Sequence, residues 1–507
     1  RFDEFAEVLM STTHSAADPT RPVRLPHRSR QGIVLGLDGP QLLFLTSTAI
    51  VMLVGVNRFG PPGLLYSAPV YLPLVVVALV TMHGLSAPRM VGLWLSKQLR
   101  HASGATVHRY RPEESRLDGT LNLPGTRASV QLWDVDGMAS VYHPRERTVS
   151  ITAELEVHGF LMKDAPERLE LAQQWSPVLA SLTQRPGIKR VTLQERTTRT
   201  TIRPARDHYK LASRRRLVDP AGPAATNYSD VLHNSERFAV GHRNYLTLTL
   251  DLVALGAQLK ALGGGKQAVQ ALSAVEAGNL AEALRAAKII VRSWLSPREV
   301  AELARTTFDP DSIPMIRNRN TDRAGVDPIA IGPMYLEEPK GRNGIVCSDS
   351  AVHTTMWIHE WPRADAPVGF LAPLVFARHP VTNEAVTHIL SIVAAPVPVG
   401  RALRQIREEK KVWRGNERLR SKRGAQGSIV DESDWLALEQ REQELVAGHG
   451  EFSYGAYLTV TAEDEQTLEQ AIAGARNALS VVGMEAQVLY CQQAEALLVN
   501  ALPLGLG

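Results

Sequence analysis

Residues 40–82 read "PQLLFLTSTAIVMLVGVNRFGPPGLLYSAPVYLPLVVVALVTM", two long apolar runs on either side of a short turn. From Pro40 to Pro88 the only Asp, Glu, Lys or Arg is Arg58, which lies in the turn at 57–62. A helix needs about 20 mostly apolar residues to cross a hydrocarbon core of about 30 Å, and each run comes close to that length. The stretch 40–84 therefore predicts a two-helix transmembrane hairpin, with a buried hairpin of a soluble domain as the alternative.

The charges beside the hairpin predict its orientation. Arg24, Arg28 and Arg30 precede the first run and Arg89 follows the second, whereas Arg58 stands alone at the tip. Because basic residues accumulate on the cytoplasmic side, we expect both termini in the cytoplasm of a bacterium, two spans in its inner membrane, and Arg58 outside. Residues 1–39 would then form a cytoplasmic tail, in which the nine residues before Met10 are expected to be upstream or cloning sequence.

The segment 85–103, after the second run, has an amphipathic helical pattern. Apolar residues recur at helical spacing, with Lys97 and Arg100 elsewhere on the helix: Met90, Val91, Trp94, Leu95 and Leu99. One interpretation is a juxtamembrane helix lying at the membrane interface. The other is the first helix of the soluble part.

The composition of the whole chain is that of a globular protein with a local apolar exception. At 507 residues with 44% hydrophobic residues, the chain suggests about three globular units besides the hairpin. Two cysteines are too few for a disulfide framework and suit a reducing compartment. A net charge of +4 is too mild to require a nucleic-acid partner.

Beyond residue 104 the pattern alternates strands and helices, which predicts α/β (α+β) lobes with ferredoxin-like strand-helix-strand units. The expected regions are a first α/β lobe at 104–200, a basic linker at 201–226, an α/β and helical region at 227–350 and a C-terminal lobe at 351–507. Helices are expected at 165–182, through Trp294, at 368–379, at 401–422 and at 432–447. Ser296, Pro297 and Glu299 together predict a capped helix start.

An Arg-rich stretch interrupts the pattern after the first lobe. Its candidate interaction surface consists of six residues: Arg203, Arg206, Lys210, Arg214, Arg215 and Arg216. Such a run can face phospholipid, nucleic acid or an acidic protein, or it can be a solvated linker. No aromatic platform for bases accompanies it.

Three segments were candidates for chemistry. "ALGGGKQAV" at 261–269 departs from the P-loop pattern and is better interpreted as a glycine turn opening a helix. His353 and His359 share a strand face but lie about 20 Å apart, too far for one metal ion. Cys347 has no companion that the sequence can place. We therefore expect no catalytic, cofactor-binding or metal-binding residue and no cofactor.

Two parts of the chain resemble components of conjugation machines. "RLPHRSRQGIVLGLDGPQLLFL" (24–45), the two apolar runs and "VGLWLSKQLR" (91–100) resemble the PrgI-like two-span membrane component of type IV secretion systems. "TMWIHEWPR" (355–363), "GEFSYGAYLTVTAEDEQTLEQAIAGARNAL" (450–479) and "QQAEALLVNALPLGLG" (492–507) are similar to the N-terminal, non-hydrolytic domain of conjugation ATPases. The combination resembles actinobacterial proteins encoded with integrating conjugative elements.

The resemblance implies a function without catalysis in this chain. In the ATPase family an equivalent Leu-Pro turn leads into the motor domain. We expect no motor domain after Gly507, and the resemblance then implies a separate P-loop ATPase acting in trans. We expect a structural or adaptor subunit of a conjugation-like type IV secretion system, oligomeric within its complex with other secretion subunits. The alternatives are a membrane core component of an actinobacterial type VII secretion system and a membrane-anchored nucleic-acid-binding module; in the preferred case nucleic acid is contacted only indirectly.

Overall fold

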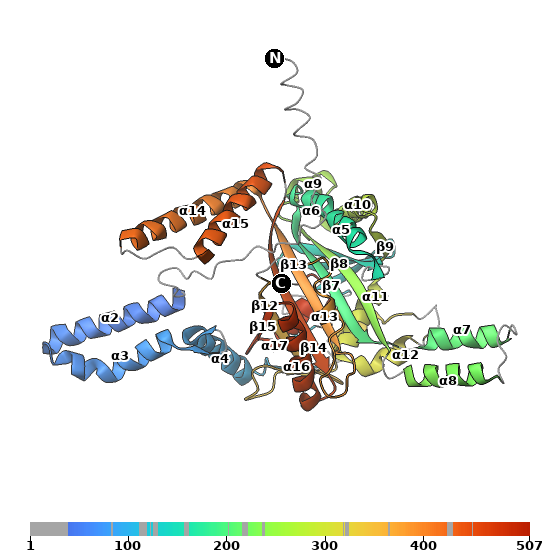
Figure 1. The fold of residues 1–507 in the computed structure, drawn as a ribbon, viewed down its shortest axis with the longest axis horizontal. Helices are drawn as coiled ribbons and strands as arrows, with labels where there is room; N and C mark the ends of the chain where they lie inside the picture. Colours follow the sequence, from blue (N-terminus) through green and yellow to red (C-terminus); the bar gives the residue numbers. More distant parts are fainter. Residues whose placement is uncertain are drawn as a thin grey trace, which may run out of the picture.

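The fold of the chain is a mixed α/β arrangement around a large antiparallel sheet, with helical projections on both sides (Figure 1). The computed structural model describes residues 39–82, 85–110, 119–121, 123–124, 130–156, 162–200, 202–214, 222–235, 239–317, 319, 324–362, 366–422, 429–448 and 450–506. The mixed α/β class expected from the sequence is thus confirmed.

Within the described residues, the main sheet has 13 strands, all paired antiparallel. Its order is β3-β10-β11-β12-β14-β13-β7-β8-β6-β5-β4, with β15 also pairing with β12 and β9 with β6. The strand bounds are β3 Val107–Arg109, β4 Gln131–Val135, β5 Met138–His143, β6 Thr148–Glu156, β7 Ile188–Arg199, β8 Val240–Asp251, β9 Ile290–Trp294, β10 Tyr335–Glu337, β11 Val346–Cys347, β12 Val352–Glu360, β13 His388–Val397, β14 Glu451–Ala462 and β15 Glu485–Val488.

The sheet is built from two units with the same topology, which we call repeat 1 (131–308) and repeat 2 (335–501). Repeat 1 contains the strand order β9-β6-β8-β7 and repeat 2 the order β15-β12-β14-β13. The helices of repeat 1 are α5 Ala165–Gln173, α6 Trp175–Thr183, α7 Arg203–Arg214, α8 Pro223–Ser235, α9 Gly256–Ala261, α10 Gly265–Ala286 and α11 Pro297–Phe308. Those of repeat 2 are α13 Ala372–Val375, α14 Val399–Lys422, α15 Ile429–Val446, α16 Glu465–Val481 and α17 Gln493–Ala501.

The two repeats are joined edge to edge. β7 of repeat 1 pairs antiparallel with β13 of repeat 2, from Thr197 opposite His388 to Val191 opposite Ala394. β7 and β13 are the second core strands of their repeats, so the pairing relates the repeats by an approximate two-fold axis. The result is one continuous sheet instead of two separate lobes.

The two faces of the sheet differ in chemistry. One face carries apolar side chains such as Ile151, Leu248 and Leu458, and α6 and α10 cover it in repeat 1 while α13 and α16 cover it in repeat 2. The other face carries buried hydroxyls such as Ser150 and Thr249, which bond to each other at 3.0 Å. α11, α17 and the segment 502–506 lie over this second face, where Arg190 donates to the Gly505 carbonyl and Thr152 to the Pro503 carbonyl. Because those hydroxyls are hydrogen-bonded, a polar sheet face is tolerated in the interior.

Each repeat carries a helical arm at the same topological position, between its second and third core strands. The arm of repeat 1 is α7–α8, and the arm of repeat 2 is α14–α15. The arms project to opposite sides of the sheet, and α14–α15 lies on the side toward which α2 and α3 extend (Figure 1).

The N-terminal apolar region forms two helices that pack against each other, α2 Gly39–Phe59 and α3 Gly63–Leu79, followed by β1 Thr81–Met82, β2 Leu85–Ser86 and α4 Ala87–Ala102. Among the described residues, α2 is the helix that is long and apolar enough to cross a membrane, with 11% of its apolar window buried. The prediction of two full-length spans is therefore met only in part, because α3 has 17 residues and ends before the short β1–β2 pair. The turn is also shorter than predicted, since Arg58 lies in the last turn of α2.

Other local predictions had mixed outcomes. The capping box at the start of α11 is confirmed, with both Ser296 and Glu299 bonded. The helix expected through Trp294 is wrong, because α10 ends at Ala286 and residues 290–294 form β9 along β6. The helix at 165–182 is divided into α5 and α6, and only 372–375 of 368–379 is α-helical. The irregular region 309–350 contains η3 Pro310–Ser312, α12 Ile313–Arg317, η5 Pro328–Ala330, β10 and β11.

Candidate functional site

The pair α2–α3 is held together by small residues. A Cβ on Gly63 would lie 2.0 Å from the Gly55 carbonyl oxygen, and one on Gly55 would lie 2.8 Å from Ser67 Oγ. Near the other end of the pair, the Gln41 amide donates to the Ala78 carbonyl at 2.9 Å. Such close backbone approach through Gly and Ser is typical of helix pairs packed in lipid. Large apolar side chains on the outside remain exposed, with Leu53 at 71% and Leu65 at 78%.

Helix α4 joins this pair to the sheet and has two contrasting faces. Its outward face is apolar and exposed: Val91, Trp94, Leu95 and Leu99 have between 47% and 66% of their surface accessible. Lys97, on the inward face, is 3% exposed. Its Nζ donates to the carbonyls of Pro339 at 3.0 Å and Arg342 at 2.8 Å, and to Asn343 Oδ1 at 3.2 Å.

A second polar contact holds the end of α4. Arg100 lies 3.3 Å from a carboxylate oxygen of the buried Glu338 and also donates to the Cys491 carbonyl. The other oxygen of Glu338 accepts the Ala494 amide of α17 at 2.7 Å. Burial lowers the pKa of the Lys97 ammonium, and the negative charge of Glu338 opposes that shift. α4 is therefore fastened to repeat 2 through buried polar groups, while its apolar face is left outside.

The residues predicted to set membrane topology fall in three places. Arg24, Arg28 and Arg30 lie outside the described residues. Arg58 is in the last turn of α2, and Arg89 is exposed in the first turn of α4. Trp94 lies on the exposed apolar face of α4, as the amphipathic pattern predicted. The helical pattern predicted that Lys97 lies away from that face, but it did not predict the backbone carbonyls and the Asn343 side chain that accept its hydrogen bonds.

The predicted basic linker contains a helix in the structure. Arg203 is the first residue of α7, and Arg206, Lys210 and Arg214 follow at four-residue spacing, so these last three share one side of that helix. Tyr209, on another side, packs on Tyr228 of α8 with ring centroids 5.1 Å apart. Lys210 and Arg214 are exposed. Arg215 and Arg216 lie outside the described residues, so the structure brings four of the six predicted residues onto one helix.

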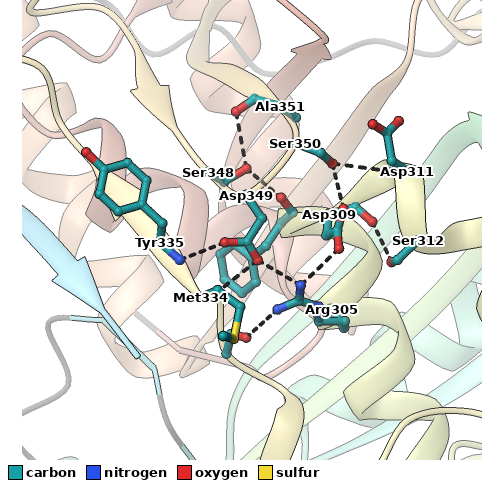
Figure 2. Close-up of polar contacts among 12 residues, drawn as sticks. Arg305, Asp309, Asp311, Ser312, Met334, Tyr335, Ser348, Asp349, Ser350 and Ala351 are labelled. Carbon is teal, nitrogen blue, oxygen red and sulfur yellow. Dashed lines mark hydrogen bonds and ion pairs between the residues drawn. The ribbon is translucent and has the colours of Figure 1, made fainter. Parts of the chain in front are cut away.

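A cavity of about 550 Å³ opens beside the junction of the two repeats. Asp311, Asp349 and Glu463 line it together with Cys347 and Ser348. Figure 2 shows Arg305 of α11 between two carboxylates, with Nη2 2.9 Å from both Asp309 Oδ2 and Asp349 Oδ2. Asp349 also accepts the backbone amides of Met334 and Tyr335 at 3.0 and 2.6 Å. These bonds tie the last helix of repeat 1 to the first hairpin of repeat 2.

The polar groups beside this cavity are not arranged for nucleophilic catalysis. Ser348 Oγ lies 2.8 Å from His353 Nε2, but Nδ1 of that ring meets the Thr461 hydroxyl at 2.9 Å, where a catalytic triad would place a carboxylate. Complete burial lowers the pKa of His353 to about 3, so the imidazole is a weak base. Burial raises the pKa of the Cys347 thiol, which disfavours the reactive thiolate. This cluster therefore fits a structural junction between the repeats.

The other chemical candidates have structural explanations. Gly263, Gly264 and Gly265 have positive φ; the first two lie in the turn after α9 and the third begins α10, so a helix precedes these glycines where a P-loop needs a strand. His359 and His353 lie near opposite ends of β12, so they do not form one site. His359 Nε2 lies 3.9 Å from Glu485 Oε2. Within the described ranges, no group of three or more His, Cys, Asp or Glu side chains is placed to hold a metal ion.

Comparisons with known proteins add no identity to this geometry. No protein-family model matches the sequence, and no curated protein matches it. The functional conclusion therefore depends on the arrangement of α2, α3 and α4, the two repeats and the resemblance of the quoted sequence segments.

Proposed function

We propose that this chain is a non-catalytic membrane subunit of a conjugation-like type IV secretion system. In this proposal α2 and α3 cross the bacterial inner membrane as a hairpin, with both termini in the cytoplasm and the turn at Arg58 outside. The two repeats, each a ferredoxin-like unit by its β-α-β-β-α-β order, form a cytoplasmic platform that docks a separate P-loop ATPase.

The observation that carries the membrane part is the division of α4 into two faces. Lys97 and Arg100 fasten one side of α4 to repeat 2, so the helix cannot turn its apolar side toward the protein interior. That apolar side, with Trp94 near its centre, is continuous in sequence with the hairpin. An amphipathic helix that lies in the headgroup region has this division of polar and apolar faces. The exposed surface of α2 and α3 supports the same interpretation, because core helices bury such side chains.

The partner part of the proposal rests on the sequence resemblance of repeat 2 to the non-hydrolytic domain of conjugation ATPases. The platform also offers α7–α8 at the end of the molecule away from α2 and α3 (Figure 1). A partner that docks in the cytoplasm would meet this end without obstruction from the membrane.

Topology reporters test the membrane part directly. Alkaline phosphatase inserted after Arg58 should be active, and a fluorescent protein fused after residue 507 should fluoresce, since each requires the compartment that the proposal assigns. An inactive phosphatase at Arg58, with the protein still resisting alkaline extraction, would reject the hairpin.

Co-purification tests the partner part. The detergent-solubilised chain should recover a conjugation-type ATPase encoded near it. Recovery of a hexameric pore component of a type VII system in its place would favour that alternative, and recovery of neither would remove the adaptor role.

The basic side of α7 favours a second candidate, a membrane-anchored nucleic-acid-binding module. Its test is salt-sensitive binding of duplex DNA that weakens when Arg206, Lys210 and Arg214 are changed to Gln, because each phosphate contact contributes to the salt dependence. DNA binding that is absent at low salt rejects this candidate.

A further inference from the structure

The arm α14–α15 carries a second basic stripe, which the sequence did not single out. Arg404, Arg407, Lys411 and Arg414 follow one another at spacings of three, four and three residues, so they share one side of α14. All four are exposed. α14 occupies the same position in repeat 2 that α7 occupies in repeat 1, so each arm has a basic stripe on its first helix.

Lys410 and Arg441 form ion pairs between α14 and α15, whereas the stripe residues make other contacts: Arg414 lies over the Trp435 ring of α15 at 5.5 Å, and Arg404 Nε donates to the Gly400 carbonyl at 3.0 Å. Lys410 lies 2.5 Å from Glu442, and Arg441 lies 3.3 Å from Glu409. Trp413 and Trp435 pack with ring centroids 4.6 Å apart and close the space between the helices. Within the described part of the chain, by contrast, Arg404, Arg407, Lys411 and Arg414 form no ion pair with a carboxylate. Arg404, Arg407 and Lys411 therefore place positive charge on the exposed side of α14, where an anionic surface can reach it.

The position of the arm decides which anionic surface it can meet. α14–α15 projects to the same side of the sheet as α2 and α3, and α7–α8 projects to the opposite side (Figure 1). We propose that the basic stripe of α14 binds the anionic phospholipid headgroups of the bilayer that α2 and α3 enter, as a second membrane contact besides α4. This inference rests on the proposed membrane anchorage. Clusters of Lys and Arg near a membrane helix gain attraction from the negative surface potential of the cytoplasmic leaflet, and this attraction falls off within a Debye length.

A photo-cross-linking amino acid can locate the arm in the intact chain. It is placed at Val412, which is 58% exposed on α14, and in a separate protein at Leu211, which is 52% exposed on α7. Each protein is reconstituted into vesicles of phosphatidylcholine alone or with 30 mol% phosphatidylglycerol as a design choice, roughly the anionic content that gives a strong surface potential. We expect lipid cross-linking at Val412 to rise at least about fivefold with the anionic lipid, and that at Leu211 to stay at background.

The charge dependence supplies the matched controls. Changing Arg404, Arg407 and Lys411 to Gln should reduce the Val412 cross-link to its level in neutral vesicles, since each basic residue near the surface contributes about a fivefold preference. The same change at Arg206, Lys210 and Arg214 of α7 removes equal charge and should leave the Val412 cross-link unchanged. Raising the salt to 1 M should act like the α14 change.

The outcomes separate this inference from the proposed function. Resistance to alkaline extraction, measured on the same vesicles, reports insertion of α2 and α3. An inserted protein whose Val412 cross-link ignores phosphatidylglycerol rejects the lipid contact and leaves the anchorage intact. Cross-linking to added duplex DNA or to protein in place of lipid also rejects it, and a protein that alkali extracts rejects the anchorage itself.

Discussion

Replacing Lys97 by Met should detach α4 from the platform while leaving the sheet folded. The substitution keeps the length of the side chain but removes the ammonium, so the carbonyls of Pro339 and Arg342 and Asn343 Oδ1 each lose a donor. Hydrogen bonds to a charged group contribute about 1.5–3 kcal/mol each, and three of them give an upper sum of about 5–9 kcal/mol. Removing the ammonium also removes the free-energy cost of burying a positive charge, the same cost that lowers the pKa of Lys97. We therefore expect a net loss of about 3–5 kcal/mol, as for other buried charged networks that lose one member.

Hydrogen exchange is the suitable assay, because a chain with several units does not unfold in one step and local opening is what the substitution changes. In the detergent-solubilised protein, amides of α4 and of residues 338–343 should exchange about 100 to 4,000 times faster, since 1.4 kcal/mol corresponds to a factor of ten. Amides of β8 and β14 should keep their protection. Arg89→Met on the exposed side of α4 is the control and should change neither region. Unchanged exchange in both α4 and 338–343 after Lys97→Met would refute the assignment of Lys97 as the fastener.

Three further changes test other parts of the structure. Gly505→Ala should detach the segment 502–506 from the sheet, at a cost of about 1–3 kcal/mol, because Gly505 has φ +61° and the new Cβ would lie 2.2 Å from Ser150 Oγ. The expected result is faster digestion by carboxypeptidase. Gly448→Ala is the control, because Gly448 also has positive φ but open space around it. His353, whose pKa falls from 6.5 to about 3, should make the protein less stable as the pH drops from about 6.5 toward 3, because only the unfolded form takes up the proton. Its share of the pH dependence, about 1.4 kcal/mol per pH unit in the opening free energy of β12 amides by hydrogen exchange, should be missing in His353→Gln, whereas the share of the buried His388, whose pKa burial also lowers, should remain. Gly63→Val should lower the thermal stability of the solubilised protein by about 1–3 kcal/mol through a clash between α2 and α3, unlike Gly92→Val, whose Cβ meets nothing.

The sequence predicted what depends on local pattern. The apolar run that forms α2, the amphipathic pattern of α4 and the cap at Ser296 are all encoded within a few residues of each other, and the structure contains all three. The α/β class followed in the same way from alternating patterns.

The sequence did not predict what depends on distant contacts. Residues 290–294 continue a helical pattern but form β9, because the second half of β6 offers a free edge beside Glu154 and Leu155. The Arg-rich stretch had the composition of a linker, yet it forms a helix whose Tyr209 packs on a ring 19 residues away. Lys97 meets acceptors that begin 242 residues further along the chain, and no local signal marks such a partner. The shared topology of the two repeats was not predicted either, because the strand order is set by pairings between segments far apart in the sequence.

The pairing of β7 with β13 has a consequence for how this chain can be divided. Each strand is an edge of its own repeat, and seven residues of each face the other directly. If the repeats were produced as separate polypeptides, each would expose that edge, and the edge could pair with another copy of itself as readily as with its natural neighbour. The covalent connection holds the two edges at an effective concentration in the millimolar range, which no ordinary expression level reaches. Mixtures of the two halves should therefore contain self-paired species in competition with the native pairing, and only the linked chain ensures that α7–α8 and α14–α15 stay on opposite sides of one sheet (Figure 1).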